Sequence, residues 1–407
     1  ITCRVKTVAK ASDWANAETG VILRDEKGKE LSWSYGGTEV SAPCEWTELK
    51  SLFIVPKGVA SIEPRLIGHN AIEVWAEGYS VAKKGLVRDR VNAAMPKELT
   101  LAGNGVSLGV DCASGRVSVT DTRTGRVWSP EPNGSDWMVL DAVQSPDSRS
   151  VTLKLLNPES TREIRAVFTL AKALPEVSVE IASEGALTRP LDFPSPFATR
   201  KGDRLIVPAN EGMSYPVDEE HQGLYRMIAY GGHGICMGFF GVIEDVTGAG
   251  WMCILETSDD AAMNARKGAG GLWQAGPSWD AQKGQFGYAR KARYVFFDKG
   301  GHVALCKRYR EHAKQAGLYK PFTEKVKRNA NIDLLIGAAN IWKMGGGKHD
   351  PVELVKEMQS FGMERILWSG GGSSNQIAAL REIPHVLVGR YDIYQDIMDP
   401  ANHEKVG

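Results

Sequence analysis

Residues 328–407 follow a different pattern from the rest of this 407-residue chain. The first 300 residues read as short strands separated by turns, whereas the final part alternates strand and helix. The predicted strands are 331–342, 365–368 and 385–394, and the predicted helices are 351–361 and 374–382. This alternation favours a parallel sheet covered by helices, and we expect the first part of a TIM (β/α)8 barrel.

The C-terminal ends of barrel strands carry the active site in enzymes of this fold. Ser369 follows the second predicted strand. We expect the following residues at these ends to bind the substrate: Asn340, Trp342, Arg390, Tyr391, Asp392 and Asp396. Polar and aromatic side chains thus converge on one rim.

Each candidate also has a structural interpretation. Asp392 suits hydrogen bonds to two sugar hydroxyls, but a pair with Arg390 accounts for it as well. Trp342 and Tyr391 suit stacking on a pyranose ring, although Trp342 can instead cover the rim of the core. Asn340 can donate to a hydroxyl or acetamido oxygen, or cap a loop.

We assign no catalytic residue. Four residues of extended strand separate Asp392 from Asp396 by about 13 Å, whereas retaining glycosidases hold their carboxylates about 5 to 5.5 Å apart. A complete barrel needs about 250 residues, so we expect the catalytic carboxylates beyond the end of this sequence.

Glycine-rich loops follow the first two predicted strands. The segment Lys343–Lys348 fails the phosphate-loop spacing, because the first glycine would fall at Trp342 and Lys348 precedes His349. We expect substrate loops here, with Ser373 or Ser374 capping the next helix.

The earlier part of the chain is predicted to hold two β-sandwiches. We place a small sandwich at 1–84, a linker at 85–98, a large antiparallel sandwich at 99–300 and a helical linker at 301–327, with a helix at 302–317. Expected hairpins join 46–55 to 60–66, and 117–120 to 127–128.

The surface of the large sandwich offers weaker signals. Trp251, Trp273 and Trp279 suggest an aromatic surface loop or core packing, and segment 211–216 suggests a wall beside a sugar pocket. Residues 219–221 fit a calcium-binding site, a contact with sugar, or a solvated turn. We predict no metal site and no cofactor, a structural calcium ion being possible but not predicted.

Composition narrows the function classes. Lys and Arg total 49, as do Asp and Glu, so no strong field favours nucleic acid. No run of about 18 apolar residues predicts a membrane span. The start at Ile1 fits a removed signal, and we expect a secreted or periplasmic bacterial protein. The six cysteines suit free thiols, or one disulfide between Cys236 and Cys253.

Two stretches resemble known families. The phrase from Glu45 to Gly58 resembles the later strands of jelly-roll carbohydrate-binding modules. The helix Tyr309–Gly317 followed by Asp333–Ala338, and the segment Gly389–Asp396, resemble the sandwich-to-barrel junction and third barrel strand of bacterial glycoside hydrolases related to endo- and exo-acting α-N-acetylgalactosaminidases. The resemblance covers residues 99 to 407.

This resemblance implies a galactose-mutarotase-like large sandwich before the barrel. It also implies a glycoside hydrolase acting on α-linked hexose or N-acetylhexosamine residues of glycans, with an Asp nucleophile and a separate acid/base on later strands. A non-catalytic carbohydrate-binding protein with a degenerate barrel, and a barrel enzyme such as a lyase or epimerase, remain alternatives.

Overall fold

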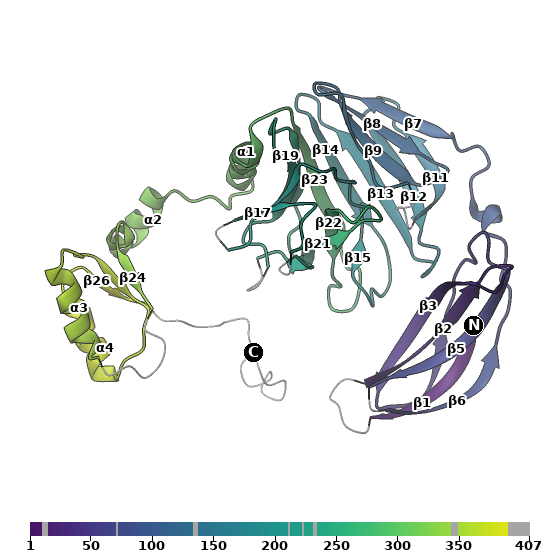
Figure 1. Ribbon diagram of the computed structural model, residues 1–407, viewed down its shortest axis with the longest axis horizontal. Helices are drawn as coiled ribbons and strands as arrows, with labels where there is room; N and C mark the ends of the chain where they lie inside the picture. The colour runs from purple at the N-terminus through teal and green to yellow at the C-terminus, as the bar shows by residue number, and fades with distance from the viewer. Residues whose placement is uncertain are drawn as a thin grey trace. The chain divides into compact units, whose positions relative to one another are not determined.

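A computed structural model describes residues 1–9, 15–70, 72–132, 137–210, 212–221, 224–230, 234–342 and 349–389. The chain forms two compact units, Ile1–Lys307 and Arg308–Gly407. Strands dominate the first unit, whereas the second mixes helices with short strands (Figure 1). Among the described residues, no helix combines the length and apolarity needed to cross a membrane.

Two three-stranded antiparallel sheets form the small N-terminal part of the first unit (Figure 1). Their orders are β4-β1-β6 and β3-β2-β5. Alternating residues of β1 point inward, so Cys3 and Val5 join Leu49 in a small core. The strands are β1 (Thr2–Ala9), β2 (Ala15–Arg24), β3 (Glu30–Ala42), β4 (Cys44–Lys50), β5 (Ser61–His69) and β6 (Ile72–Ser80).

The predicted hairpin between 46–55 and 60–66 is wrong. β4 pairs with β1, and β5 pairs with β2, so the two strands belong to different sheets. The Pro56-Lys57-Gly58 turn therefore connects two sheets instead of two neighbouring strands. A single 3-10 turn, η1 (Val87–Arg90), interrupts the predicted linker before β7 begins at Glu98.

The large part of the first unit contains three antiparallel sheets. Their orders are β10-β9-β8-β7, β15-β22-β21-β18 and β11-β12-β13-β14-β23-β20-β19-β16-β17. The predicted hairpin of β9 with β10 is confirmed, because Val127 faces Thr120 and Trp128 faces Val119. The strands from β7 to β14 are β7 (Glu98–Ala102), β8 (Val106–Asp111), β9 (Arg116–Asp121), β10 (Arg126–Trp128), β11 (Met138–Gln144), β12 (Ser150–Leu156), β13 (Glu163–Leu170) and β14 (Glu176–Ala182).

One continuous apolar core lies among these sheets. Alternation along β13 buries Ile164, Ala166, Phe168 and Leu170 on one face. A buried ion pair joins Arg126 of β10 to Asp203 of β16, with Nη1 2.8 Å from Oδ1. The remaining strands are β15 (Leu191–Asp192), β16 (Asp203–Val207), β17 (Met213–Pro216), β18 (Met227–Ile228), β19 (Phe239–Glu244), β20 (Gly250–Leu255), β21 (Ala261–Lys267), β22 (Trp273–Trp279) and β23 (Arg290–Phe297).

The predicted helix at 302–317 is confirmed as α1 (Gly301–Gln315). Leu305 is fully buried and packs over Gly241 of β19, which has no side chain to hold the helix away. Gly317 follows the helix with a φ of 72°, a conformation that glycine adopts without strain.

The second unit contains a three-stranded parallel sheet in the order β24-β25-β26. Its elements alternate as predicted (Figure 1). They are α2 (Phe322–Arg328), η2 (Ala330–Leu335), β24 (Ala339–Ile341), α3 (Pro351–Ser360), β25 (Ile366–Trp368), α4 (Ser374–Arg381) and β26 (Val386–Val388). Both connecting helices contribute to one core, in which Val355 and Leu380 meet Ile366, Trp368 and Val386.

The first predicted strand of this unit is largely wrong. Residues 330–335 form a 3-10 helix, and only 339–341 are extended. The Asn329 side chain caps the 3-10 helix by accepting from the Asn331 amide at 3.1 Å. Arg365 donates to the carbonyls of Asp333 and Ile336, which fixes this helix beside the start of β25.

The structure shows a mostly β chain followed by a parallel α/β unit, which confirms the coarse fold class. The jelly-roll, galactose-mutarotase-like and TIM-barrel designations remain predictions, as do the domain boundaries at 84, 98, 300 and 327. The predicted third strand runs to 394, and its residues after 389 lie outside the described part of the chain.

Candidate functional site

The C-terminal ends of β24 and β25 place two polar side chains together. Asn340 lies on β24, and Ser369 directly follows β25. The Ser369 hydroxyl donates to Oδ1 of Asn340 at 2.8 Å. The amide oxygen of Asn340 is therefore engaged, and among the described residues none accepts a hydrogen bond from its Nδ2. This nitrogen can donate two hydrogen bonds to a ligand.

The surrounding backbone holds this pair in place. The Ser369 amide donates to the Ile341 carbonyl at 2.9 Å, and the Gly389 amide donates to the Trp368 carbonyl at 2.8 Å. The sheet ladder thus continues past the assigned strands. Gly389 has no side chain, which leaves room beside the Ser369 hydroxyl.

Helix caps organise the loops at the same end of the sheet. Oδ1 of Asp350 accepts from the Val352 amide at 2.7 Å and so caps α3. Oδ2 of the same carboxylate accepts from Nε2 of Gln376 at 2.8 Å. Gln376 and Ser373 form a capping box at the start of α4, as predicted for Ser373. One carboxylate therefore links both helix starts.

The face of the sheet opposite the helices carries Asn340, Leu367 and Leu387, which are in register with one another. Leu367 and Leu387 are only partly buried, and Asn340 is exposed. Trp342 follows β24 and exposes 49% of its surface. About half of this residue is therefore open to solvent, and its role as a sugar platform or as a cover of the core rim stays a prediction.

Four predicted site residues lie outside the described part of the chain. These are Arg390, Tyr391, Asp392 and Asp396, and the loop 343–348 also falls outside it. Their assignment to substrate binding stays a prediction. The link between Asp350 and Gln376 was not predicted; an Asp directly before Pro351, at the start of the predicted helix 351–361, was the available signal for the cap.

Two of the tryptophans expected on the surface belong to the core instead. Trp251 is 1% exposed and Trp279 is fully buried. The Trp251 ring lies 5.5 Å from the Phe197 ring, and the Trp279 indole donates to the Phe193 carbonyl at 2.8 Å. Consecutive residues of β20 and β22 are buried, so both faces of these strands are covered. The choice between surface loop and core packing is thus settled for these two.

Trp273 is only partly buried and belongs to a small surface cluster. Its indole nitrogen donates to the Glu219 carbonyl at 3.0 Å, and its ring centre lies 6.5 Å from that of His221. His221 also packs against Tyr215, at 4.9 Å. Residues 213–216 form the edge strand β17. Within the described residues, no group of three His, Cys, Asp or Glu side chains is placed to hold a metal ion.

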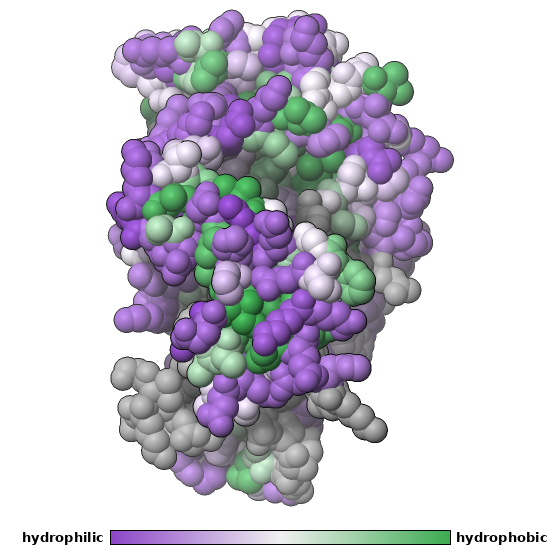
Figure 2. Space-filling view, turned by 90° about the vertical axis from the view of Figure 1, so that its left-hand side faces the viewer, coloured by the Kyte–Doolittle hydropathy of each residue, from purple (hydrophilic) through white to green (hydrophobic). Residues whose placement is uncertain are grey.

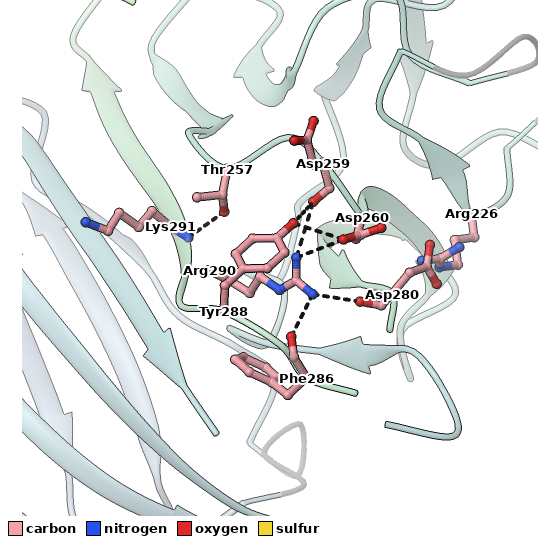
Figure 3. A network of polar contacts seen from close by, with 9 residues as sticks. All are labelled: Arg226, Thr257, Asp259, Asp260, Asp280, Phe286, Tyr288, Arg290 and Lys291. Atoms are coloured by element: carbon pink, nitrogen blue, oxygen red, sulfur yellow. Dashed lines mark hydrogen bonds and ion pairs between the residues drawn. The ribbon is translucent and has the colours of Figure 1, made fainter. Parts of the chain in front are cut away.

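A buried arginine organises the loops beside β22 and β23 (Figure 3). Nη2 of Arg290 donates to the carbonyls of Asp280 at 3.0 Å and Phe286 at 2.9 Å. Its guanidinium carbon lies 3.6 Å from the Tyr288 ring centre. Burial, followed by the hydrogen bond to Asp260, raises the pKa of Tyr288 to about 12. Because these contacts are mostly to backbone, we interpret the network as structural.

The cysteines are free thiols, and the alternative bond between Cys236 and Cys253 is not formed. Cys253 is fully buried and Cys236 is exposed.

On the side of the molecule in Figure 2, hydrophilic residues predominate, and hydrophobic ones occur in small groups between them.

No protein-family model and no curated protein matches this chain. Among solved structures, the ligand-free α-N-acetylgalactosaminidase NagBb from Bifidobacterium bifidum matches with a TM-score of 0.58 and 17% identity, over 75% of this chain and 62% of that chain. Its GalNAc complex matches with a TM-score of 0.56 and 17% identity, over 75% and 61% of the two chains. Its Gal-NHAc-DNJ complex matches with a TM-score of 0.56 and 16% identity, again over 75% of this chain and 61% of that chain.

These matches show a glycoside-hydrolase-related fold. At 16 to 17% identity they show the fold alone. The chain spans less than two thirds of the length of the enzyme that it matches.

Proposed function

We propose that this chain is part of a glycoside hydrolase that acts on α-linked hexose or N-acetylhexosamine residues of glycans. The observation that carries the proposal is the fold likeness, over 75% of the chain, to an enzyme whose solved structures include a GalNAc complex. The rim at the ends of β24 and β25 adds a polar donor and an exposed indole, which are the groups that bind a pyranose.

In this proposal the sheet of the second unit is the first part of a (β/α)8 barrel. Support comes from three parallel strands in chain order and from the shared core of α3 and α4. The partly exposed face with Asn340, Leu367 and Leu387 then lines the barrel interior. Active sites of such barrels lie at the C-terminal ends of the strands.

The chemistry then divides between binding and bond cleavage. Nδ2 of Asn340 donates to a sugar hydroxyl or acetamido oxygen, while Ser369 holds the amide in orientation. Trp342 stacks on the apolar face of the ring. The four rim residues from Arg390 to Asp396 complete the binding site. An Asp nucleophile and an acid/base carboxylate lie on later strands, and they are not among the described residues.

The test uses protein produced from the complete coding sequence and a panel of α- and β-nitrophenyl glycosides. We expect release of nitrophenol from an α-linked galactoside or N-acetylgalactosaminide. Retention on a mucin column without release from any glycoside contradicts hydrolysis and favours a non-catalytic carbohydrate-binding protein. A protein that does not release nitrophenol and is not retained on the column contradicts both functions.

The proposal also includes export of the protein to the periplasm or the medium. Fractionation of the producing cells tests it. Recovery of the protein with the cytoplasmic fraction contradicts export and leaves the hydrolase proposal unaffected.

A further inference from the structure

The outer face of the β4-β1-β6 sheet carries two exposed tryptophans. Side chains of β1 alternate, so Val5 points into the core while Arg4 and Lys6 lie on the outer face. Trp75 of β6 is the register partner of Lys6 and is 44% exposed. It therefore shares the outer face with Lys6.

Trp46 reaches the same face from the other side of β1. The pairing of β1 with β4 shifts between Val5 and Thr7, so that Glu45 and Trp46 together face Lys6. This arrangement is a β-bulge, which re-aims the side chains of the bulged strand. The Arg4 guanidinium lies 5.6 Å from the Trp46 ring centre, which places this ring on the outer face as well. Trp46 is 39% exposed.

The spacing of the two indoles sets the size of the ligand. Their strands flank β1, so their backbones lie about 9.5 Å apart, twice the distance between neighbouring strands. This is wider than one pyranose ring. A ligand that contacts both rings therefore extends over two or more sugar units.

The charges on this face favour a neutral ligand. Arg4 pairs with Glu77 at 2.7 Å, and Lys6 pairs with Glu45 at 2.9 Å, so both cations are neutralised. Of the other charges on this face, Lys50 lies opposite Thr2, while Glu48 lies opposite Arg4 and Glu73 opposite Val8, which leaves one carboxylate in excess. A slightly acidic surface repels nucleic acid, anionic lipid and acidic polysaccharide. Carboxylates and paired cations can instead exchange hydrogen bonds with hydroxyl groups.

We propose that the outer face of the β4-β1-β6 sheet binds a neutral glycan chain of two or more sugar units, with Trp46 and Trp75 as stacking platforms. Aromatic rings combine a large apolar face with a polar tip, which suits a sugar that has one apolar face and a hydroxyl rim. This site is separate from the barrel rim and does not depend on hydrolysis.

The test measures binding to the protein produced from its complete coding sequence. The probes are the neutral tetrasaccharides chitotetraose and maltotetraose and, as an acidic comparison, a tetramer of galacturonic acid. Calorimetry is run in saturating GalNAc and galactose, so that a site specific for one sugar unit is already occupied. We expect a neutral tetrasaccharide to bind and the acidic one not to bind.

Variants locate the site. Trp46→Ala and Trp75→Ala should each raise the dissociation constant about five- to tenfold, and the double variant should abolish measurable binding. Trp33→Ala is the matched control, because Trp33 is 58% exposed but lies on β3 of the other sheet. Circular dichroism checks folding, and if the double variant misfolds the two single variants decide.

Several outcomes overturn the proposal. The first two are that neither neutral tetrasaccharide binds, and that both single variants bind as tightly as the wild type. The other two are that Trp33→Ala loses as much affinity as the single variants, and that the protein prefers the acidic tetramer. A wild-type dimer that dissociates in the double variant, without glycan binding, assigns this face to a second copy of the chain. Failure here leaves nitrophenyl glycoside hydrolysis untouched, so the two proposals fail separately.

Discussion

Arg290 shows how a single buried cation can hold loops together. Its side chain is fully buried and donates to the Asp280 and Phe286 carbonyls (Figure 3). Arg290→Ala leaves these carbonyls without that donor and should lower the free energy of unfolding by about 3 kcal/mol. Urea denaturation measures the change. Lys291→Ala is the control: its side chain is 49% exposed, so we expect a change within about 0.5 kcal/mol. Equal losses in both variants contradict this role.

The raised pKa of Tyr288 predicts that the free energy of unfolding depends on pH at high pH. The phenol loses its proton near pH 10 in the unfolded chain, whereas burial raises its pKa to about 12 in the folded protein. Between these values the folded state binds more protons, so the contribution of Tyr288 to stability falls as pH rises. Tyr288→Phe should make the decline between pH 10 and 12 shallower. Unfolding free energies at several pH values test this, and identical slopes refute it.

Single residues were the hardest feature to predict from sequence. Trp251 and Trp279 lie between glycines and turns in the sequence, which suggested a surface loop as readily as the core. Their burial is decided by pairing with strands distant in the chain, as with β20 against β23. Asn340, by contrast, was predicted to lie on the first strand of the parallel sheet and does so, although only 339–341 of the predicted strand 331–342 are extended.

At the scale of elements, Asp350 couples α3 to α4. Asp350→Asn keeps an oxygen to cap α3 but replaces the acceptor for Gln376 with a second donor. We expect a loss of about 1 kcal/mol in local stability. Hydrogen exchange measures this loss of local stability as weaker protection of the β25 amides. Lys356→Ala, an exposed change in the middle of α3, should leave protection unchanged. Unchanged protection in Asp350→Asn rejects the coupling.

Gly241 allows α1 to approach β19. An added Cβ would lie 2.7 Å from Cδ2 of Leu305 and 2.4 Å from the Trp251 carbonyl oxygen. Gly241→Ala should therefore destabilise the first unit by about 1 to 3 kcal/mol. Thermal unfolding gives the comparison with Gly270→Ala, where a Cβ meets nothing within 4 Å. A melting temperature equal to that of the control variant would show that the helix does not pack tightly here.

Element types were predicted better than their partners. Helices α1, α3 and α4 follow apolar periodicity and local caps, which the sequence displays directly. The strand expected at 331–342 failed because local capping by Asn329 and contacts of Arg365 favour a 3-10 helix. The hairpin around Pro56 failed because each strand finds a distant partner, which no local signal specifies.

At the scale of the molecule, the change from antiparallel strands to parallel strand–helix units was visible in the sequence and is present in the structure. The sequence could not supply the order of the nine-stranded sheet, where β23 inserts between β14 and β20. Nor did it supply the catalytic carboxylates. In the proposed function, the sugar specificity would depend on those carboxylates and on the residues at the ends of β24 and β25 together.

The central claim is that the ends of β24 and β25 bind the sugar whose bond is cleaved. The most direct test compares kcat/KM of the wild type and Asn340→Asp on the best α-nitrophenyl glycoside. Aspartate keeps the acceptor for Ser369 but loses the donor, so we predict a fall of about tenfold or more, with Lys356→Ala unchanged. Equal kcat/KM for Asn340→Asp and the wild type would contradict the account.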